Sequence, residues 1–215
     1  PRCARAVGLS RRSTPALVLE DETSMARCAA YLREHAPVHL VVDATGALSI
    51  DGRGPEKRLA DLDGDTLLRA MQINATGPML AMKHLLPLLA RQEREIWAKL
   101  SARVGSIEDN HKGGWYAYRA SKAALIRMAG CIRRELGGQG VRAYSVNPGV
   151  VATEAVTATL GDDGTLAQRY GALPPEAIAQ ALFWLATSPQ APAVARGKDM
   201  LDLPELVKTQ GLWQP

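Results

Sequence analysis

The chain has 215 residues, of which 47% are hydrophobic and 22% charged, and its formal net charge is +4. This apolar content excludes global disorder, since disorder requires low hydrophobicity and high net charge. No apolar run reaches the ~18 residues of a transmembrane helix, and the three cysteines, which form no CxxC pair, indicate reduced thiols. We therefore expect one cytoplasmic domain covering residues 1–215, with no membrane segment.

Short apolar runs alternate with longer amphipathic segments. The runs predict strands at residues 5–10, 16–20, 39–45, 96–101, 142–147 and 198–203. The 3.6-residue periodicity predicts helices at 23–35 (capped by Thr23 or Ser24), 65–91, 114–136 and 174–187, and we expect kinks at Pro78 and Pro87.

This alternation predicts an α/β fold, a three-layer and doubly wound parallel sheet of the Rossmann type. In such sheets ligands bind beyond the carboxyl ends of the strands. Polar or turn-forming residues follow the predicted strands at 10–12, 43–46, 101–103 and 147–149. We expect the binding site where these segments meet.

Tyr118 and Lys122 carry the sharpest chemical signal. Residues four apart share one face of a helix, and a lysine ammonium beside a phenol is expected to lower the tyrosine pKa. Tyr118 is therefore a candidate general acid or base. A YxxxK spacing is common by chance and is usually a surface tyrosine and a solvated lysine. The surrounding residues therefore decide whether it indicates an active site.

Three further segments change the odds: SARVGSI at 101–107, GGWYAYRASKAAL at 113–125 and NPGVVAT at 147–153, with Asn74 upstream in INATGP. With these segments the chain resembles the short-chain dehydrogenase/reductase family, and within it the small carbonyl reductases that include the bacterial C-factor proteins and the insect sniffer protein. The resemblance extends from Arg5 onward.

The resemblance implies a role for each matching position. Tyr118 would exchange a proton with the substrate oxygen, Lys122 would bind the nicotinamide ribose, and Asn74 would hold a water that links Lys122 to solvent. The other implied cofactor contacts are Ala44, Thr45, Gly46, Pro148, Gly149, Val151 and Thr153. The implied reaction is hydride transfer between a nicotinamide and a carbonyl or alcohol carbon of a small molecule.

Arg11 and Arg12 directly follow the first predicted strand. An acidic residue there would bind the ribose 2′-hydroxyl of NAD, whereas arginine accommodates the 2′-phosphate of NADP. No acid stands in GLSRR, so NADP is expected over NAD. The alternative is that both are solvated loop arginines.

Three departures from the family pattern stand out. The first is that no strand, glycine-rich turn and helix of the dinucleotide fingerprint is present before residue 5. The chain starts at Pro1 without Met, and we expect it to be a fragment whose first strand, phosphate loop and most of the first helix would precede Pro1.

The second departure is that Ala102 occupies the position of the family's catalytic serine. Ser101 lies one residue earlier and is the candidate donor to the substrate oxygen, although neighbours on a strand face opposite sides. Ser106 is another candidate hydroxyl. The third departure is that Asp43 and Ala44 replace two asparagines of the family's NNAG turn.

The leading hypothesis is an NADP-dependent carbonyl reductase or alcohol dehydrogenase. The alternative is a catalytically impaired relative kept for binding or regulation, which Ala102 and the missing phosphate loop favour. The scattered histidines predict no metal site, and no basic stripe with interleaved aromatics predicts nucleic-acid binding. The leucines near 85–89 and the apolar face of the 114–136 helix are read as core, or as the interface of a homo-oligomer when the chain is complete.

Overall fold

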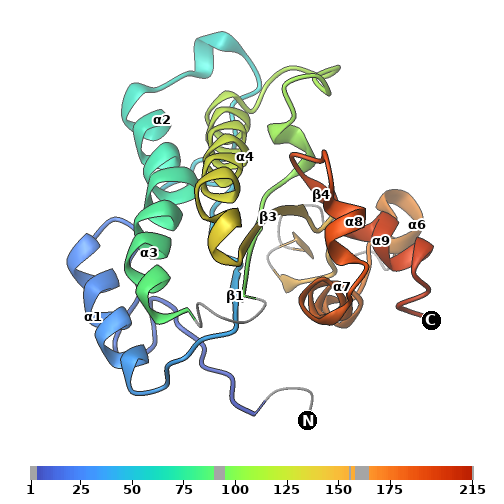
Figure 1. Cartoon of the computed structure of the whole chain (residues 1–215). Helices are drawn as coiled ribbons and strands as arrows, with labels where there is room; N and C mark the ends of the chain where they lie inside the picture. Colours follow the sequence, from blue (N-terminus) through green and yellow to red (C-terminus); the bar gives the residue numbers. More distant parts are fainter. Residues whose placement is uncertain (1–3, 90–94, 155, 158–164, 215) are drawn as a thin grey trace.

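Four parallel strands form the centre of the molecule. The computed structural model describes residues 4–89, 95–154, 156–157 and 165–214 (Figure 1). The strands follow one another across the sheet in chain order, and they are β1 (Leu40–Asp43), β2 (Glu95–Leu100), β3 (Val141–Asn147) and β4 (Leu201–Asp202). The predicted parallel α/β class is confirmed, and so are the strands expected near 40, 96, 142 and 201.

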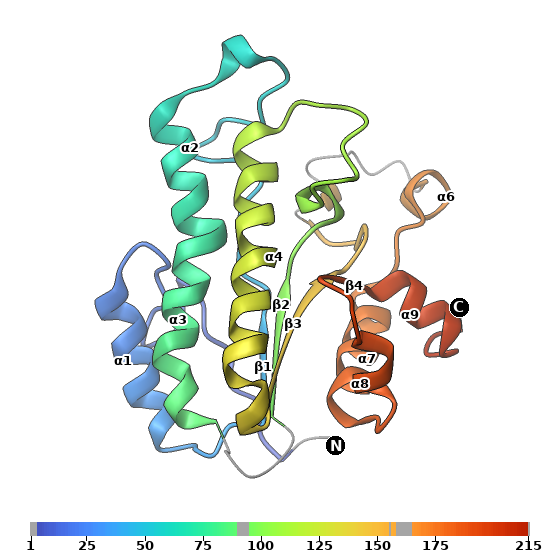
Figure 2. The same cartoon turned by 45° about the horizontal axis from the view of Figure 1, so that its top comes forward.

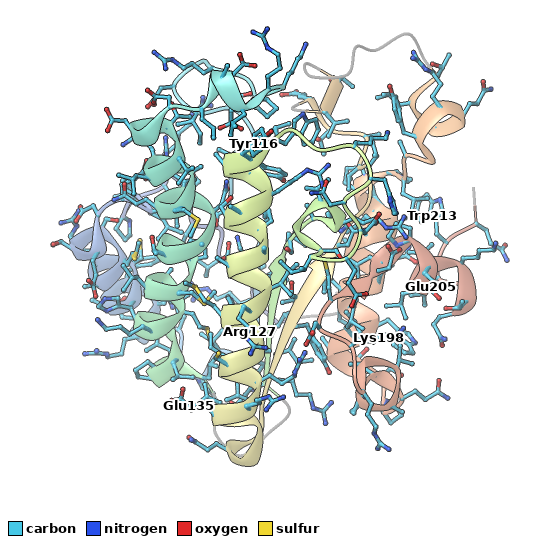
Figure 3. All side chains as sticks on the ribbon, turned by 90° about the horizontal axis from the view of Figure 1, so that it is seen from above. Tyr116, Arg127, Glu135, Lys198, Glu205 and Trp213 are labelled. Atoms are coloured by element: carbon cyan, nitrogen blue, oxygen red, sulfur yellow. The ribbon has the colours of Figure 1, made fainter. Side chains whose placement is uncertain are left out.

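Helices cover both faces of this sheet and make three layers (Figure 2). One face carries α1 (Glu22–Arg33), α2 (Gly64–Met71), α3 (Gly77–Leu85) and α4 (Tyr116–Leu136). The other face carries α7 (Pro175–Thr187), α8 (Ala191–Ala195) and α9 (Leu203–Thr209), and the short α6 (Leu166–Tyr170) lies nearby. Seen from above, Tyr116 and Glu135 mark the two ends of α4, while Lys198 and Trp213 lie beyond the sheet on the other side (Figure 3).

The core consists of two apolar layers that share the central strands. Trp97 and Ala143 pack with Ala129 of α4, whereas Ile96 and Val146 pack toward α7 and α9. Alternate residues of β2 thus face opposite layers, which explains why the strand reads as a nearly continuous apolar run.

Two predicted strands are wrong. Residues 5–10 and 16–20 form no strand, because no described strand lies beside them to complete their backbone hydrogen bonds. The segment turns instead at Ser10, whose carbonyl accepts from the amide of Leu17, and Leu19 packs among residues of α1, α2 and α3. β1 is consequently an edge strand, and Val42 is 42% exposed.

The cap of α1 also differs from the prediction. Asp21, not Thr23 or Ser24, caps the helix, and its carboxylate accepts a hydrogen bond from the amide of Thr23. Ser24 is fully buried and bonds to the backbone of Val18. A carboxylate outside the helix can reach the first amides, whereas Ser24 is already inside the first turn.

The long helix predicted at 65–91 is interrupted as its prolines suggested. A π-helical turn over Gln72–Thr76 separates α2 from α3, and a 3₁₀ turn over Leu86–Leu88 follows; residues 90 and 91 lie outside the described part. Pro78 has no amide proton, so it cannot donate to the carbonyl four residues before it. The widened turn places Asn74, which is fully buried, on its inner side. None of the helices formed by the described residues combines the length and apolarity needed to cross a membrane.

Gly77 is where this interrupted helix approaches the N-terminal segment. A Cβ on Gly77 would lie 2.5 Å from the carbonyl oxygen of Leu19 and 2.8 Å from that of Gln72. We predict that Gly77→Ala lowers the free energy of unfolding by about 1–3 kcal/mol, because backbone atoms cannot move aside cheaply. Urea denaturation measures this.

Gly64→Ala is the matched control, since a Cβ there meets nothing within 4 Å and Gly64 also belongs to a helix. We expect it to leave stability unchanged or to raise it by about 0.4–1 kcal/mol. Equal denaturation midpoints for the two variants would show that the contact at Gly77 is not tight.

Candidate active site

The first turns of α4 lie over the carboxyl ends of β1 and β2 and bring Tyr118 and Lys122 to the predicted edge of the sheet. The ammonium of Lys122 lies 5.5 Å from the centre of the Tyr118 ring, and the Trp115 ring meets the Tyr118 ring edge-on at 6.2 Å. The helical spacing predicted in the sequence therefore does place the pair on one face.

The effect on the phenol differs from the prediction. Burial raises the pKa of Tyr118, and no hydrogen bond between its hydroxyl and Lys122 is formed in the described structure. The ammonium lies over the ring face, so it does not contact the oxygen where phenolate charge would concentrate. In this state the tyrosine stays protonated at neutral pH and can act as an acid.

Lys122 is the second buried group of the pair. Its pKa is lowered to about 7, first by burial and then by the positive charge of Lys99, while the charge of Asp43 acts in the opposite direction. Its ammonium donates one long hydrogen bond, at 3.4 Å, to the carbonyl of Leu100, the last residue of β2. A lysine carries three donors, so in the described structure Lys122 retains hydrogen-bonding capacity for a ligand.

Asn74 clamps the chain that leaves β1. Its side-chain oxygen accepts from the amide of Ala47 at 2.7 Å, and its nitrogen donates to the carbonyl of Ala47 at 2.8 Å and to the hydroxyl of Ser121 at 3.2 Å. The Ser121 hydroxyl donates in turn to the carbonyl of Tyr118. Asn74 therefore links the turn after β1 to the helix that carries Tyr118.

The turn itself passes between Asn74 and Lys122 at Gly46. A Cβ on Gly46 would lie 3.0 Å from the side-chain oxygen of Asn74 and 3.2 Å from the ammonium of Lys122, and φ there is +141°. Only glycine fits this conformation and this space without strain. Thr45 is half-buried beside Gly46, while Ala44 is exposed.

The floor of the site is formed by Lys99 together with Asp43, Thr45 and Gly46. Lys99 was not identified from the sequence. Its side chain is fully buried, and its ammonium donates to Asp43 at 2.9 Å and to the carbonyl and hydroxyl of Thr45 at 2.7 and 3.0 Å. The sequence does contain a signal for Lys99, because it is a lysine inside the apolar strand EIWAKL. A buried lysine requires a partner, so such a position indicates an ion pair or a site.

Ser101 and Ala102 follow β2. Ser101 is buried, and in the described structure its hydroxyl has no hydrogen-bond partner. Ala102 begins a 3₁₀ turn whose Gly105 leaves no room for a Cβ, which would lie 2.8 Å from the backbone of Lys122. The segment with the missing serine therefore packs directly on α4 at Lys122.

The predicted PG segment lies at the end of β3. The Asn147 side-chain oxygen accepts from the amides of Arg103 and Gly149, which joins the ends of β2 and β3. Pro148 and Gly149 (φ +68°) form the turn, and a Cβ on Gly149 would lie 2.6 Å from Pro204.

Beyond this turn the chain bridges to the residues before α7. Val151 forms an isolated parallel bridge with Leu173. Thr153 is exposed, and its hydroxyl accepts from the amide of Val156.

The arginines predicted to select the cofactor lie apart from these residues. Arg11 and Arg12 occupy the exposed turn before α1, and Arg11 pairs with Glu20 at 2.8 Å. Glu20 also pairs with Arg69. Arg12 makes no side-chain ion pair within the described residues, and neither arginine contacts Lys122.

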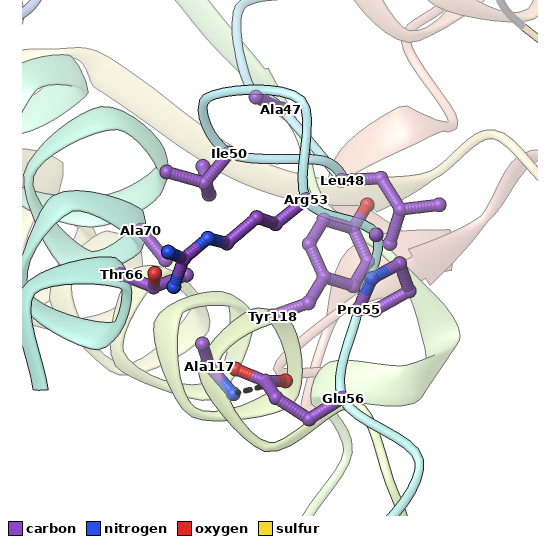
Figure 4. Close-up of a pocket in the computed structure, with 11 residues that line it drawn as sticks. Ala47, Leu48, Ile50, Arg53, Pro55, Glu56, Thr66, Ala70, Ala117 and Tyr118 are labelled. Atoms are coloured by element: carbon purple, nitrogen blue, oxygen red, sulfur yellow. Dashed lines mark hydrogen bonds between the residues drawn. The ribbon is translucent and has the colours of Figure 1, made fainter. Parts of the chain in front are cut away.

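A small pocket opens beside Tyr118 (Figure 4), and its eleven lining residues come from the loop after β1, from α2 and from α4. Glu56, a second residue that sequence reasoning missed, is 7% exposed in its wall. Its carboxylate accepts from the amide of Ala117 and its carbonyl from that of Trp115, so it fixes the start of α4. No local sequence motif predicts the role of Glu56, because the helix that it caps begins sixty residues later in the chain.

Known proteins resemble this chain in sequence. A family model described as enoyl-(acyl carrier protein) reductase matches residues 10–195. Two curated relatives are a 1-hydroxy-2-glutathionyl-2-methyl-3-butene dehydrogenase of Rhodococcus (32% identical over 65% of this chain and 59% of the relative) and the C-signal protein of Myxococcus xanthus (35% identical over 50% of this chain and 63% of the relative). The chain thus covers about three-fifths of the length of these relatives.

Solved structures share the fold. The carbonyl reductase sniffer of Drosophila melanogaster superposes with a TM-score of 0.68 over 88% of this chain and 74% of its own, at 20% identity. A short-chain dehydrogenase/reductase of Mycobacterium ulcerans gives 0.68 over 89% of this chain and 69% of its own, at 21% identity. Together with the match over residues 10–195, these likenesses establish that the chain belongs to the short-chain dehydrogenase/reductase family.

Proposed function

We propose that this protein is an NADP-dependent oxidoreductase that interconverts a carbonyl and an alcohol on a small molecule. The observation that carries the proposal is the pairing of Tyr118 and Lys122 on successive turns of α4, above the strand ends and next to Asn74 and Gly46. The activities for which relatives are named support the reaction type: a dehydrogenase of Rhodococcus, an L-xylulose reductase of Caenorhabditis elegans and the sniffer carbonyl reductase.

The residues present fit the nicotinamide-ribose end of such a cofactor. Lys122 has hydrogen-bond donors to spare beside the glycine turn at Gly46, and Gly149 forms a second turn at the end of the neighbouring strand β3. The bound cofactor would supply or accept the hydride. The described residues show no strand, glycine-rich turn and helix that would hold its pyrophosphate, so we assign no residue to that part.

Each side chain then has a defined task. Tyr118, kept protonated by burial, gives its proton to the substrate oxygen as the carbonyl is reduced. Lys122 holds the ribose hydroxyls, while Asn74 fixes the turn after β1 against α4. The unpaired hydroxyl of Ser101 is the proposed second donor to the substrate oxygen in place of a serine at Ala102.

We further propose that residues 1–215 belong to one dinucleotide-binding domain without its first βα unit, and that the complete protein is a cytoplasmic homo-oligomer. Among the described residues, Cys28 is a buried free thiol and Cys131 an exposed one. Leu88, Leu89 and Ala129 are buried within the chain, so the apolar residues left for a subunit contact are the half-buried ones on α3 and α4.

The first test is Tyr118→Phe, with loss of NADPH absorbance followed over a panel of small aldehydes and ketones. We expect turnover to fall by about 100-fold or more, because the general acid is lost. The Kd for NADPH should change by less than about twofold, since the ring remains. Tyr116→Phe is the matched control, two residues earlier and 36% exposed.

If Tyr118→Phe retains activity within about tenfold of the unchanged chain, the general-acid role is wrong. If the unchanged chain binds NADPH but reduces nothing in the panel, the result favours the second candidate function, which is a non-catalytic relative that binds the cofactor. Ala102 is the observation that favours that candidate.

The second test concerns the cofactor. A neighbour from Burkholderia multivorans was solved with bound NADP (26% identical, TM-score 0.58), and a plant relative is named as NADPH-dependent. We predict that NADPH binds about tenfold or more tightly than NADH, because Arg12 is exposed and available for the 2′-phosphate. Fluorescence titration measures both Kd values.

Arg12→Gln should remove most of that preference, while Arg27→Gln, an exposed arginine on α1 that pairs with Asp21, should leave it intact. Equal or tighter binding of NADH by the unchanged chain would contradict the assignment.

A further inference from the structure

Lys99 is a charged residue in the middle of the central sheet. It lies in β2 directly opposite Asp43 of β1, and its side chain is fully buried. All three of its donors are used, one on the carboxylate of Asp43 and two on Thr45. A buried ammonium is tolerated only when it is paired and hydrogen-bonded in this way.

The same contacts set the shape of the turn after β1. One oxygen of Asp43 accepts from the amide of Thr45 at 3.0 Å and from its hydroxyl at 2.6 Å, in addition to Lys99. The next residue, Gly46, is the one that lies against Asn74 and Lys122. A displacement of the Asp43–Lys99 ion pair would therefore move Thr45, and with it the turn that lies beneath Lys122.

Lys99 also acts on Lys122 through its charge: burial lowers the pKa of Lys99, and the paired carboxylate of Asp43 opposes that effect and favours the ammonium form. The ionisable groups that face Lys122 are Tyr118 on its own helix, Lys99 from β2 and Asp43 from β1, while Asn74 is polar but uncharged. The pKa of Lys122 is lowered to about 7. The charge of Lys99 is the second-largest cause, after burial, and the opposing charge of Asp43 only partly offsets it.

We propose that Lys99 is a positioning residue of the site, one that fixes the turn after β1 beneath Lys122 and keeps a second positive charge close to Lys122 inside the protein. This deepens the proposed function and rests on it for the tasks of Tyr118 and Lys122. The consequence is that Lys122 can lose its proton near neutral pH, where an isolated ribose-binding lysine would stay charged.

The test measures the titration of Lys122 directly, with neither cofactor nor substrate. The full chain is labelled with ¹³C at lysine Cε, the Lys122 signal is assigned with Lys122→Arg, and its pKa is followed by NMR. In the unchanged chain we expect a midpoint near 7. In Lys99→Met the midpoint should rise by about one pKa unit, because the repelling charge is gone.

Two variants separate charge from packing. Lys99→Arg keeps the positive charge, so the Lys122 midpoint should not rise. The paired Asp43→Asn and Lys99→Met substitution removes both charges, avoids a lone buried carboxylate, and should raise the midpoint less than Lys99→Met alone. The paired variant also decides the question if Lys99→Met fails to fold.

Lys208, exposed on α9, supplies the internal reference signal in every variant. The proposal is overturned if the Lys122 midpoint stays within about 0.3 pKa unit in the paired variant, and in Lys99→Met if it folds, or if Lys99→Arg raises it as much as Lys99→Met. Neither result depends on turnover, so a failure of the carbonyl reductase proposal, seen as an active Tyr118→Phe, remains distinguishable.

Discussion

The turn that follows β1 is held from two directions by buried polar side chains, and the candidate site depends on this constraint. Lys99 fixes Asp43 and Thr45 from the neighbouring strand, while Asn74 fixes Ala47 from the widened turn between α2 and α3. Backbone groups that leave a sheet must find partners, and here side chains of the site provide them. The hydrogen bonds that shape the floor of the site are therefore the same ones that pair the buried polar groups beneath it.

Burial then decides the proton affinities above that floor. It raises the pKa of Tyr118 and lowers that of Lys122, so both shifts favour the neutral forms. A tyrosine that keeps its proton suits reduction, in which an oxygen must be protonated. A lysine that titrates near neutral pH makes the site responsive to charged neighbours, since a small change in field then changes its protonation.

The departures from the family pattern fall at neighbouring places in the site. Asp43 stands on β1 opposite Lys99 of β2, and Ala102 follows β2 just before Gly105, which packs on Lys122. An ion pair in a sheet carries a large desolvation penalty and does not by itself imply stability. Its value here lies in placement, because both partners point to the end of the sheet where the turn must be held.

The amino-acid sequence by itself determined the alternation of strands and helices, the helix breaks near Pro78 and Pro87, and the Tyr118–Lys122 spacing, because these follow from local periodicity and backbone chemistry. It also placed the chain in its family. Only the tertiary structure decided that residues 5–10 and 16–20 are not strands, since a strand exists only where a neighbour completes its hydrogen bonds. It also decided that Lys99 and Glu56 belong to the site and that the pKa of Tyr118 rises. Those outcomes depend on which residues distant in the sequence exclude water from one another, and no local pattern encodes that.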